Sequence, residues 1–253
     1  MTPVSSIYRL NESKLQFHNA CSSVESSKLN GEDHDSLNFG GLNVVEGYKR
    51  CKKLVIEAGF KAEIEWQSTV SIEDLSESTF LREHAWVTLS SGMKEKVIRN
   101  LFQRFSRIFY NWKSADLITK NEDLCKDSAL TIFANYTKIN AILQTSHIVS
   151  YNGFDIIKKL IIENPEKVLM EFPYIGPVTY YHLAKNIGVQ VAKPDRHLSR
   201  LVNELNISNV QTLCRYIGER TGDSIPVVDI VLWRYATITE DFVMRFIQLS
   251  KKI

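Results

Sequence analysis

The sequence has only four cysteines, and they are far apart: Cys21, Cys51, Cys125 and Cys214. No C-x-x-C pair occurs among them. Zinc ribbons and iron–sulfur clusters need several closely spaced thiolates, so this arrangement argues against both kinds of metal centre. Nothing suggests a disulfide framework either, and a reducing, cytoplasmic environment is therefore the expected location.

Long hydrophobic runs are also missing. No stretch of 18 or more apolar residues occurs, and the first residues, MTPVSSIYRLNESK, have no apolar signal-like core. We therefore expect a soluble intracellular protein that does not enter a membrane. It would be associated with the nucleoid, or be nuclear in a eukaryote, if its partner is DNA.

A strand pattern is the third absence, since no alternating apolar run is longer than a few residues and no internal repeat is present. Apolar residues instead recur at helical spacing, which predicts an all-α fold. The helix at 78–90 is apolar nearly all round and should be central. The other helices expected outside the motif described below are 44–58, 93–112, 123–134, 137–149, 153–162, 210–218, 226–238 and 239–251.

The net charge is small, +2 from 31 basic and 29 acidic residues, which is weak evidence for any partner. A nucleic-acid surface would have to come from local clustering. The predicted helix 93–112 offers one such cluster on one side: Lys94, Lys96, Arg99, Arg104 and Arg107. This side is either a solvated face or a DNA surface. With 253 residues, the chain can bury one large core or two smaller ones.

The most informative stretch is 166–204. A helix with apolar Val168, Leu169 and Phe172 is stopped by Pro173, and a second helix begins after a short turn. Two helices joined in this way form a helical hairpin. The first backbone N–H groups of the second helix lack intrahelical partners, so they suit a phosphate.

A single acid follows among bases, in Lys193-Pro194-Asp195-Arg196-His197, just before another amphipathic run at 198–205. Taken alone, an aspartate between a proline and a helix is most simply an N-cap. A catalytic role is compatible with capping, because one carboxylate oxygen can cap while the other faces a substrate.

The segment Phe172-Pro173-Tyr174-Ile175-Gly176-Pro177-Val178-Thr179-Tyr180 resembles the helix-hairpin-helix of the base-excision DNA glycosylases. In that superfamily a catalytic Asp follows, a little under twenty residues beyond the position that holds Lys in bifunctional members. Here Asp195 lies 17 residues beyond Val178. The resemblance implies a monofunctional DNA glycosylase, because Val178 replaces the Lys, and one without an iron–sulfur cluster. Tyr174 departs from the pattern, which has Gly there.

The resemblance also implies the architecture: two helical domains with an active-site cleft between them. By this mapping 93–195 is a helical bundle with the helix-hairpin-helix (166–188) and the catalytic loop (189–195). Residues 43–92 and 196–253 form the second domain, and 1–42, rich in Ser, Asn and Asp, are an irregular arm. The implied partner is double-stranded DNA with a damaged or modified base, bound by a monomer without cofactor or catalytic metal. A monovalent cation at the hairpin turn is a further implication.

The resemblance assigns roles to individual residues. Asp195 would stabilise the oxocarbenium-like sugar and orient water. Contacts to the DNA backbone are expected from Ile175, Gly176, Val178, Thr179, Lys185, Lys193 and Arg200. A base pocket, and a wedge that fills the hole left by the flipped base, are expected from Glu83, Trp86, Ser90, Ser91, Met93, Tyr180 and Tyr181. Aromatic residues at helical spacing, like those in this set, more often belong to the hydrophobic core. The loop at 90–93 fits an ordinary connection between two helices equally well.

Three other interpretations stay open. The chain could be a bifunctional glycosylase/lyase that uses a lysine other than one at 178. It could excise an unusual base from foreign DNA, such as that of a phage, rather than serve DNA repair. It could also be a non-catalytic DNA-binding protein, in which the hairpin only grips phosphate. His84 and Asp229 are read as structural residues, with His84 a satisfied core histidine.

Overall fold

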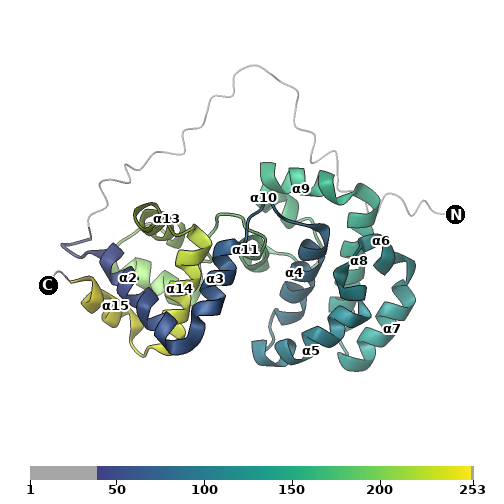
Figure 1. Ribbon diagram of the computed structural model, residues 1–253, viewed down its shortest axis with the longest axis horizontal. Helices are drawn as coiled ribbons and strands as arrows, with labels where there is room; N and C mark the ends of the chain where they lie inside the picture. Colours follow the sequence, from purple (N-terminus) through teal and green to yellow (C-terminus); the bar gives the residue numbers. More distant parts are fainter. Residues whose placement is uncertain (1–38, 252–253) are drawn as a thin grey trace, which may run out of the picture. The chain divides into compact units, whose positions relative to one another are not determined.

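The computed structural model describes residues 39–251, which contain helices and no strands (Figure 1). This confirms the all-α prediction. The described chain divides into two compact units. We call Ser71–Val189 the central unit, and residues 39–70 together with 190–251 the outer unit. Most of the predicted N-terminal arm, residues 1–38, lies outside the described residues.

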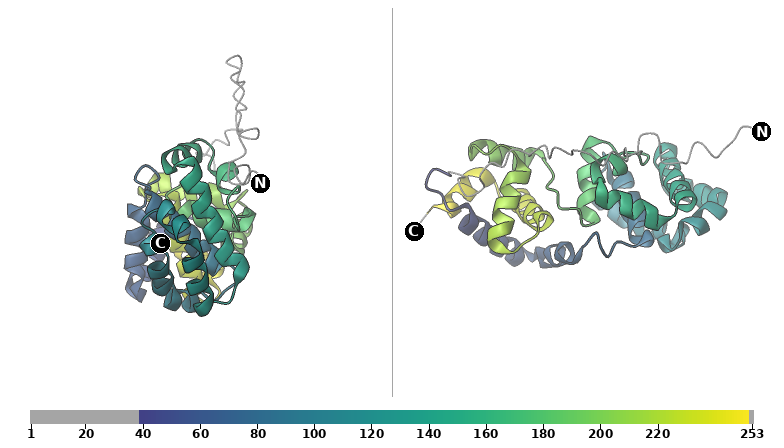
Figure 2. Two further views of the ribbon diagram at one scale, coloured as in Figure 1. Left: turned by 90° about the vertical axis from the view of Figure 1, so that its right-hand side faces the viewer. Right: turned by 90° about the horizontal axis from the view of Figure 1, so that it is seen from above.

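The outer unit is built from the two segments that precede and follow the central unit in the sequence. Its helix α2 lies against α13, α14 and α15, and α3 lies against α14 (Figures 1 and 2). Buried apolar residues from all these helices form one core. The elements are α2 (Val44–Val55), the π-helical η3 (Ile56–Phe60), α3 (Lys61–Thr69), α12 (Arg196–Glu204), α13 (Val210–Thr221), α14 (Ile225–Ile238) and α15 (Phe242–Ser250).

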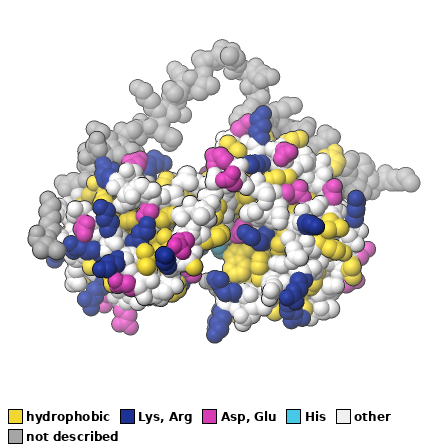
Figure 3. Space-filling model, in the orientation of Figure 1, with side chains coloured by type: hydrophobic (Ala, Val, Ile, Leu, Met, Phe, Trp, Pro, Cys, Tyr) yellow, Lys and Arg dark blue, Asp and Glu magenta, His cyan; other side chains and the backbone are white. Residues whose placement is uncertain are grey.

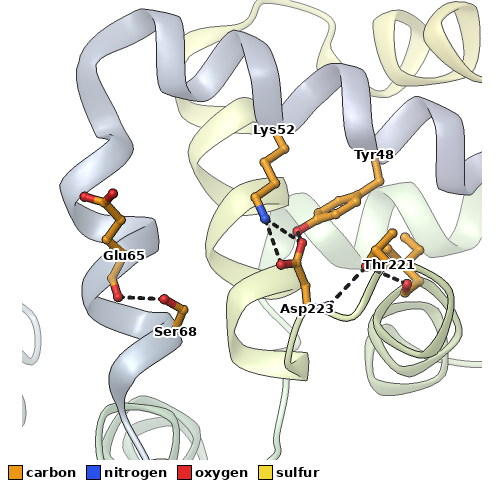
Figure 4. Close-up of polar contacts among 7 residues, drawn as sticks. Tyr48, Lys52, Glu65, Ser68, Thr221 and Asp223 are labelled. Carbon is orange, nitrogen blue, oxygen red and sulfur yellow. Dashed lines mark hydrogen bonds and ion pairs between the residues drawn. The ribbon is translucent and has the colours of Figure 1, made fainter.

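A polar contact also ties α2 to the turn between α13 and α14 (Figure 4). The Tyr48 hydroxyl donates to Asp223 Oδ2 at 2.6 Å, and Lys52 Nζ donates to Oδ1 of the same carboxylate at 2.7 Å. Burial and the neighbouring carboxylate raise the pKa of Tyr48, which keeps its hydroxyl protonated as the donor. The carboxylate thus has two donors, and together with the hydrogen bond from Arg50 to the Leu249 carbonyl oxygen it helps to specify how the two segments of this unit pair.

The central unit is organised around α4 and α8. Helix α4 packs against α5, α8 and α11, and it is buried on nearly every side, as its all-round apolar pattern predicts. The elements are α4 (Glu77–Ser90), α5 (Glu95–Ile108), the 3-10 turn η4 (Tyr110–Trp112), α6 (Ala115–Lys120), α7 (Glu122–Ile132), α8 (Tyr136–Asn152), α9 (Phe154–Glu163), α10 (Pro165–Leu169) and α11 (Pro177–Asn186).

The boundary between the units differs from the predicted division. The sequence mapping places 43–92 with the C-terminal segment, whereas α4 belongs to the central unit because its neighbours α5, α8 and α11 all lie there. Residues 190–195, which are most of the loop predicted to be catalytic, belong to the outer unit and not to the bundle with which they were predicted. Asp195 and the turn between α10 and α11 therefore belong to different units.

Two surface properties bear on partners. On the face shown in Figure 3, Lys and Arg side chains are interspersed with Asp and Glu over both units, in keeping with the small net charge. Within residues 39–251, no helix combines the length and the apolar character needed to cross a bilayer.

Candidate functional site

The turn between α10 and α11 is shaped by its own backbone. Helix α10 ends at Leu169, and the Ile175 N–H then donates to the Phe172 carbonyl oxygen at 3.1 Å. Helix α11 begins at Pro177, a residue suited to the first helical position because that N–H has no partner in any case. The two helices are therefore joined by a turn only seven residues long, from Met170 to Gly176.

Tyr174 adopts a left-handed backbone conformation, with φ of 70°. Glycine reaches this region without strain, whereas a residue with a Cβ loses about 1–2 kcal/mol there. The glycosylase pattern has Gly at this position, a residue that adopts this conformation without strain, whereas here a tyrosine adopts it. The Tyr174 side chain is half exposed.

Thr179 connects this turn to the first turn of α11. Its hydroxyl oxygen accepts from the Gly176 N–H at 2.8 Å and donates to the Tyr174 carbonyl oxygen at 3.2 Å. One side chain in the first turn of α11 thus satisfies two backbone groups that precede the helix, as a capping residue at the third helical position does. Thr179 therefore lies at the turn predicted to bind DNA, but its hydroxyl is used for hydrogen bonds within the protein.

The amides expected to face DNA are only partly available. The N–H groups of Ile175 and Gly176 donate within the turn, so these two residues do not offer amides to a phosphate. The N–H groups of Val178 and Thr179 have no acceptor among the described residues, and the Val178 side chain is 72% exposed. Lys185, expected at a phosphate, is instead buried on α11.

His84, on α4, holds the same turn from inside. Its Nε2 lies 3.0 Å from the Pro173 carbonyl oxygen and 3.1 Å from Thr145 Oγ1. A carbonyl only accepts, so Nε2 carries the proton and Nδ1 is left without a hydrogen-bond partner in the described chain. Burial lowers the pKa of His84 to about 4, and the ring is neutral near pH 7. His84 is a core histidine, as the sequence suggested, but only one of its two ring nitrogens has a hydrogen-bond partner among the described residues.

The loop after α4 is also held by a buried side chain. Lys138, from α8, is 3% exposed, and its Nζ donates to the Leu89 carbonyl oxygen at 2.7 Å and to that of Ser91 at 2.6 Å. The Ser90 hydroxyl donates back to Val87 O at 3.3 Å. Only Met93 projects, with 40% of its surface exposed.

Lys138 was missed in the sequence, although a signal for it exists. It shares one helical face with Ile142 and Val149, both buried. A lysine at that spacing within an apolar stripe must bring its ammonium to buried acceptors, because an unpaired buried charge is strongly destabilising. The pattern could therefore have marked the residue, but not its partners on another helix.

Some of the residues expected to form a base pocket are buried in the core, and others are only partly buried. Tyr180 is buried, with its ring centre 5.0 Å from that of Tyr181, and Glu83 is buried beside Asn186, whose amide donates to it at 2.9 Å. Burial raises the pKa of the Glu83 carboxyl. Tyr180 and Glu83 are therefore packing residues in the central unit. Trp86 is half buried and packs edge-on against Phe102, with ring centres 5.1 Å apart.

In the outer unit, Asp195 is the N-cap of α12. Its Oδ1 accepts from the His197 N–H at 2.8 Å and from the Leu198 N–H at 2.9 Å. No hydrogen bond or ion pair reaches its other oxygen, Oδ2, from any residue in the described part of the chain. The capping role expected from the sequence is confirmed, and one carboxylate oxygen is left over.

The loop that leads to Asp195 has no regular structure but is held at several backbone groups. The Lys193 N–H donates to Asp229 Oδ1 at 3.2 Å, and the Ala192 N–H donates to Gln211 Oε1 at 2.7 Å. Gln211 Nε2 in turn donates to the Gln190 carbonyl oxygen at 3.0 Å. Asp229 is buried on α14, which matches its structural reading. Helices α13 and α14 thus fix the approach to Asp195.

Two basic residues expected at DNA lie near this loop. Lys193 is half exposed, and Arg200 is exposed on α12 one helical turn beyond Arg196, which is exposed as well. Residues four apart share a face of a helix, so Arg196 and Arg200 point the same way. Among residues 39–251, no group of three His, Cys, Asp or Glu side chains could hold a metal ion.

The comparisons with known proteins add no relative. Neither a family model, nor a curated protein, nor a solved structure matches this chain significantly.

Proposed function

We propose that the protein is a monofunctional DNA glycosylase of the helix-hairpin-helix type. It removes a damaged or modified base from double-stranded DNA by hydrolysing the N-glycosidic bond. The observation that carries this proposal is Asp195, whose Oδ1 takes both capping hydrogen bonds while Oδ2 has no partner among residues 39–251. A carboxylate fixed by one oxygen and open at the other is suited to a developing positive charge.

The proposed reaction breaks the bond between C1′ and the base, and the base leaves with the bonding electrons. Positive charge then builds on the sugar, where the Asp195 carboxylate stabilises it electrostatically. A water molecule attacks C1′ and forms the new C–O bond. The water's proton goes to Asp195 or to solvent, the departing base takes up a proton from solvent, and the products are a free base and an abasic site. No metal or cofactor enters this scheme.

DNA binding is assigned to the turn between α10 and α11. The N–H groups of Val178 and Thr179 point outward at the start of a ten-residue helix, where the helix dipole favours an anion. Tyr174 stands where the hairpin pattern has Gly, and its left-handed backbone is a conformation that Gly adopts easily, which supports the resemblance at this position. Arg200 and Lys193 supply further positive charge in the outer unit.

The absence of strand cleavage is part of the proposal. A lyase needs an amine that forms a Schiff base at C1′. The position that holds this amine in bifunctional relatives is Val178, and it is highly exposed on the first turn of α11. An exposed apolar side chain there is compatible with contact to DNA but supplies no nucleophile.

The test is a base-release assay with a panel of duplexes, each carrying one modified base, with and without alkali. Wild type is compared with Asp195→Asn. An amide oxygen can make the same cap, as Asn209 shows at α13, where its Oδ1 accepts from the Thr212 N–H at 2.9 Å. The variant should therefore fold normally and yet lose at least about 100-fold in rate, the size expected when one electrostatic stabiliser is removed.

The outcomes separate the candidates. Alkali-dependent cleavage of one duplex, lost in Asp195→Asn, supports the proposal and identifies the base, and thereby a repair or a foreign-DNA substrate. Cleavage without alkali, together with a borohydride-trapped adduct, would identify a lyase. An equal rate in wild type and variant would reject Asp195 as the catalyst.

A second candidate is a non-catalytic DNA-binding protein. The observation in its favour is that capping of α12 alone would account for Asp195. This candidate predicts that wild type and Asp195→Asn bind duplex DNA equally and release no base from any member of the panel.

A further inference from the structure

The starting point is the position of Lys138 in its own helix. Lys138 is in the first turn of α8, which begins after the Asn135 cap. A cation near a helix N-terminus is unfavourable, because that end carries partial positive charge. The lysine is also almost fully buried, which costs further free energy. Lys138 therefore does not serve the stability of α8.

The side chain instead serves the C-terminus of α4, on another helix. Its ammonium donates to the carbonyl oxygens of Leu89 and Ser91, where the helix dipole favours a cation. Helix α4 is already followed by a glycine in the left-handed conformation, Gly92 with φ of 67°, yet the carbonyls of Leu89 and Ser91 still accept from the buried ammonium. Unlike a glycine cap, the lysine also fixes the position of the loop relative to α8.

The same ammonium lies beneath the turn between α10 and α11. Its Nζ is 5.6 Å from the centre of the Tyr174 ring and 5.9 Å from that of Phe133, distances at which a cation is attracted to an aromatic face. A single nitrogen thus contacts the loop after α4 and the strained residue of the turn. Strain in a half-exposed residue persists only where surrounding contacts hold it.

These contacts make the exposed side chains of two segments interdependent. Met93 is the last residue of the loop that Lys138 holds, and the Tyr174 ring lies over the ammonium. The two side chains are about two-fifths exposed, 40% and 39%. Both segments lie in the central unit, so this arrangement rests on contacts within one compact body. Exposed apolar side chains held at the ends of rigid helices are suited to fill or flank an unstacked position in a duplex.

We propose that Lys138 is a positioning residue that holds the Ser91–Met93 loop and the Tyr174 ring in one arrangement, so that Met93 and Tyr174 together contact the distorted site of a DNA duplex. The inference rests on the proposed glycosylase function, because it assigns these side chains to DNA from which a base is removed. Lys138 acts through the two segments and does not touch the reacting atoms.

The test uses the full-length protein and two duplexes that differ at one position. One contains a tetrahydrofuran abasic analogue next to 2-aminopurine, and the other is intact. Dissociation constants and 2-aminopurine fluorescence are measured for wild type and Lys138→Met, which keeps the apolar stem but has no donor. The matched control is Lys126→Met, in the same unit, whose ammonium lies 5.2 Å from the Tyr136 ring centre.

We expect wild type to prefer the tetrahydrofuran duplex and to change its fluorescence. Lys138→Met should lose this preference by about 10-fold, the equivalent of about 1.4 kcal/mol, with its affinity for the intact duplex changed less than about two-fold. Lys126→Met should behave as wild type. A well-folded Lys138→Met that keeps the full preference overturns the inference, and so does a wild type that releases base but has no preference for the analogue.

A second experiment covers the case in which Lys138→Met does not fold. Met93→Ala and Tyr174→Leu change exposed side chains, and leucine keeps the same backbone strain at 174. If Lys138 holds the two segments together, the double variant loses less preference than the product of the single losses, by at least about three-fold. Independent, multiplicative losses overturn the inference. A wild type that neither releases base nor distinguishes the duplexes rejects the proposed function as well.

Discussion

At the scale of single residues, His84 is the clearest case of a group whose protonation is set by the fold. Its ring is fully buried on α4 and donates to the Pro173 carbonyl, and burial lowers its pKa from 6.5 to about 4. Between these two values an unfolded chain binds a proton that the folded chain does not. The protein therefore has this part of its stability above pH 6.5 and loses it as the pH falls to about 4.

The expected loss is about 3 kcal/mol over that range, since each unit of pKa difference corresponds to about 1.4 kcal/mol. Urea denaturation of wild type and His84→Gln at pH 7, 6, 5 and 4.5 measures it. Glutamine keeps an N–H donor but does not titrate, so the difference in stability between the two proteins should shrink as the pH falls. A difference that stays constant would show that His84 titrates alike in the folded and unfolded states.

The residue scale also shows which site residues a sequence can reveal. The cap made by Asp195 could be predicted because its partners lie two and three residues away, so local spacing determines the contact. Thr179 was predicted only as a contact to DNA, whereas its hydroxyl bonds to backbone groups three and five residues before it. Lys138 and Gln211 could not be assigned roles, because their acceptors and donors come from distant elements. The burial of Lys185 was mispredicted for the same reason: its side of α11 is covered by packing that no local pattern specifies.

At the scale of elements, the end of α11 depends on a close approach that only glycine permits. Gly188 has φ of 93°, and a Cβ there would lie 2.4 Å from the backbone nitrogen of Ile72 and 2.9 Å from Ser71 Cα. Backbone atoms cannot move aside as a flexible side chain can. Both the conformation and the space at this position therefore exclude a larger residue.

We predict that Gly188→Ala lowers the free energy of unfolding by at least about 3 kcal/mol, which combines left-handed strain with overpacking. Gly59→Ala is the matched control, because Gly59 has the same φ of 93° with nothing within 4 Å of the added Cβ. Its free energy of unfolding should fall only by the cost of the left-handed conformation, about 1–2 kcal/mol. Equal losses in the two variants, measured by urea denaturation, would mean that the contact with Ile72 carries no cost.

A second prediction at this scale concerns the loop before α12. Asp229→Leu removes the acceptor of the Lys193 N–H and should cost about 1–3 kcal/mol, whereas Asp229→Asn keeps an acceptor oxygen and should cost less. Hydrogen exchange of the Lys193 amide, followed by NMR, provides the local measurement. Protection should survive in the Asn variant and fall in the Leu variant. Fast exchange already in wild type would contradict the contact.

Element boundaries show where sequence patterns run out. The expected helix at 93–112 is broken, because Tyr110, Asn111 and Trp112 have positive φ and form a separate turn after α5. Aromatic residues packed into the core, such as Trp112, override the helical pattern there. Helix α3 was not predicted as a helix, since only Ile64 and Gln67 of its nine residues are buried and no apolar stripe marks it.

At the scale of the whole molecule, the two units differ in how many segments of the chain they combine. Every described residue of the central unit lies in one continuous segment, Ser71–Val189, with its own buried residues from α4 to α11. The outer unit combines two segments, 39–70 and 190–251, into one core. A continuous segment with its own core is able to fold as an independent domain.

We therefore predict that residues 71–189 expressed alone give a helical protein with a cooperative thermal transition. Residues 190–251 alone should remain largely unfolded, because α14 and α15 pack against α2 in the native unit. Circular dichroism and thermal melts of the two fragments provide the measurement. A structureless 71–189 fragment would show that the central unit requires the rest of the chain.

The interrupted outer unit has a consequence for the order of events on the ribosome. Helix α2 emerges early, but its partners α14 and α15 follow only after the 119 residues of the central segment have been made. The 169 residues between Val55 and Ile225, the first residue of α14, take roughly 8–34 seconds at about 5–20 residues per second. Throughout this time the apolar side of α2, with Tyr48, Cys51 and Val55, has no partner, while the central unit can already fold. The nascent chain is therefore most exposed to aggregation, and most accessible to a chaperone, at its earliest described helix.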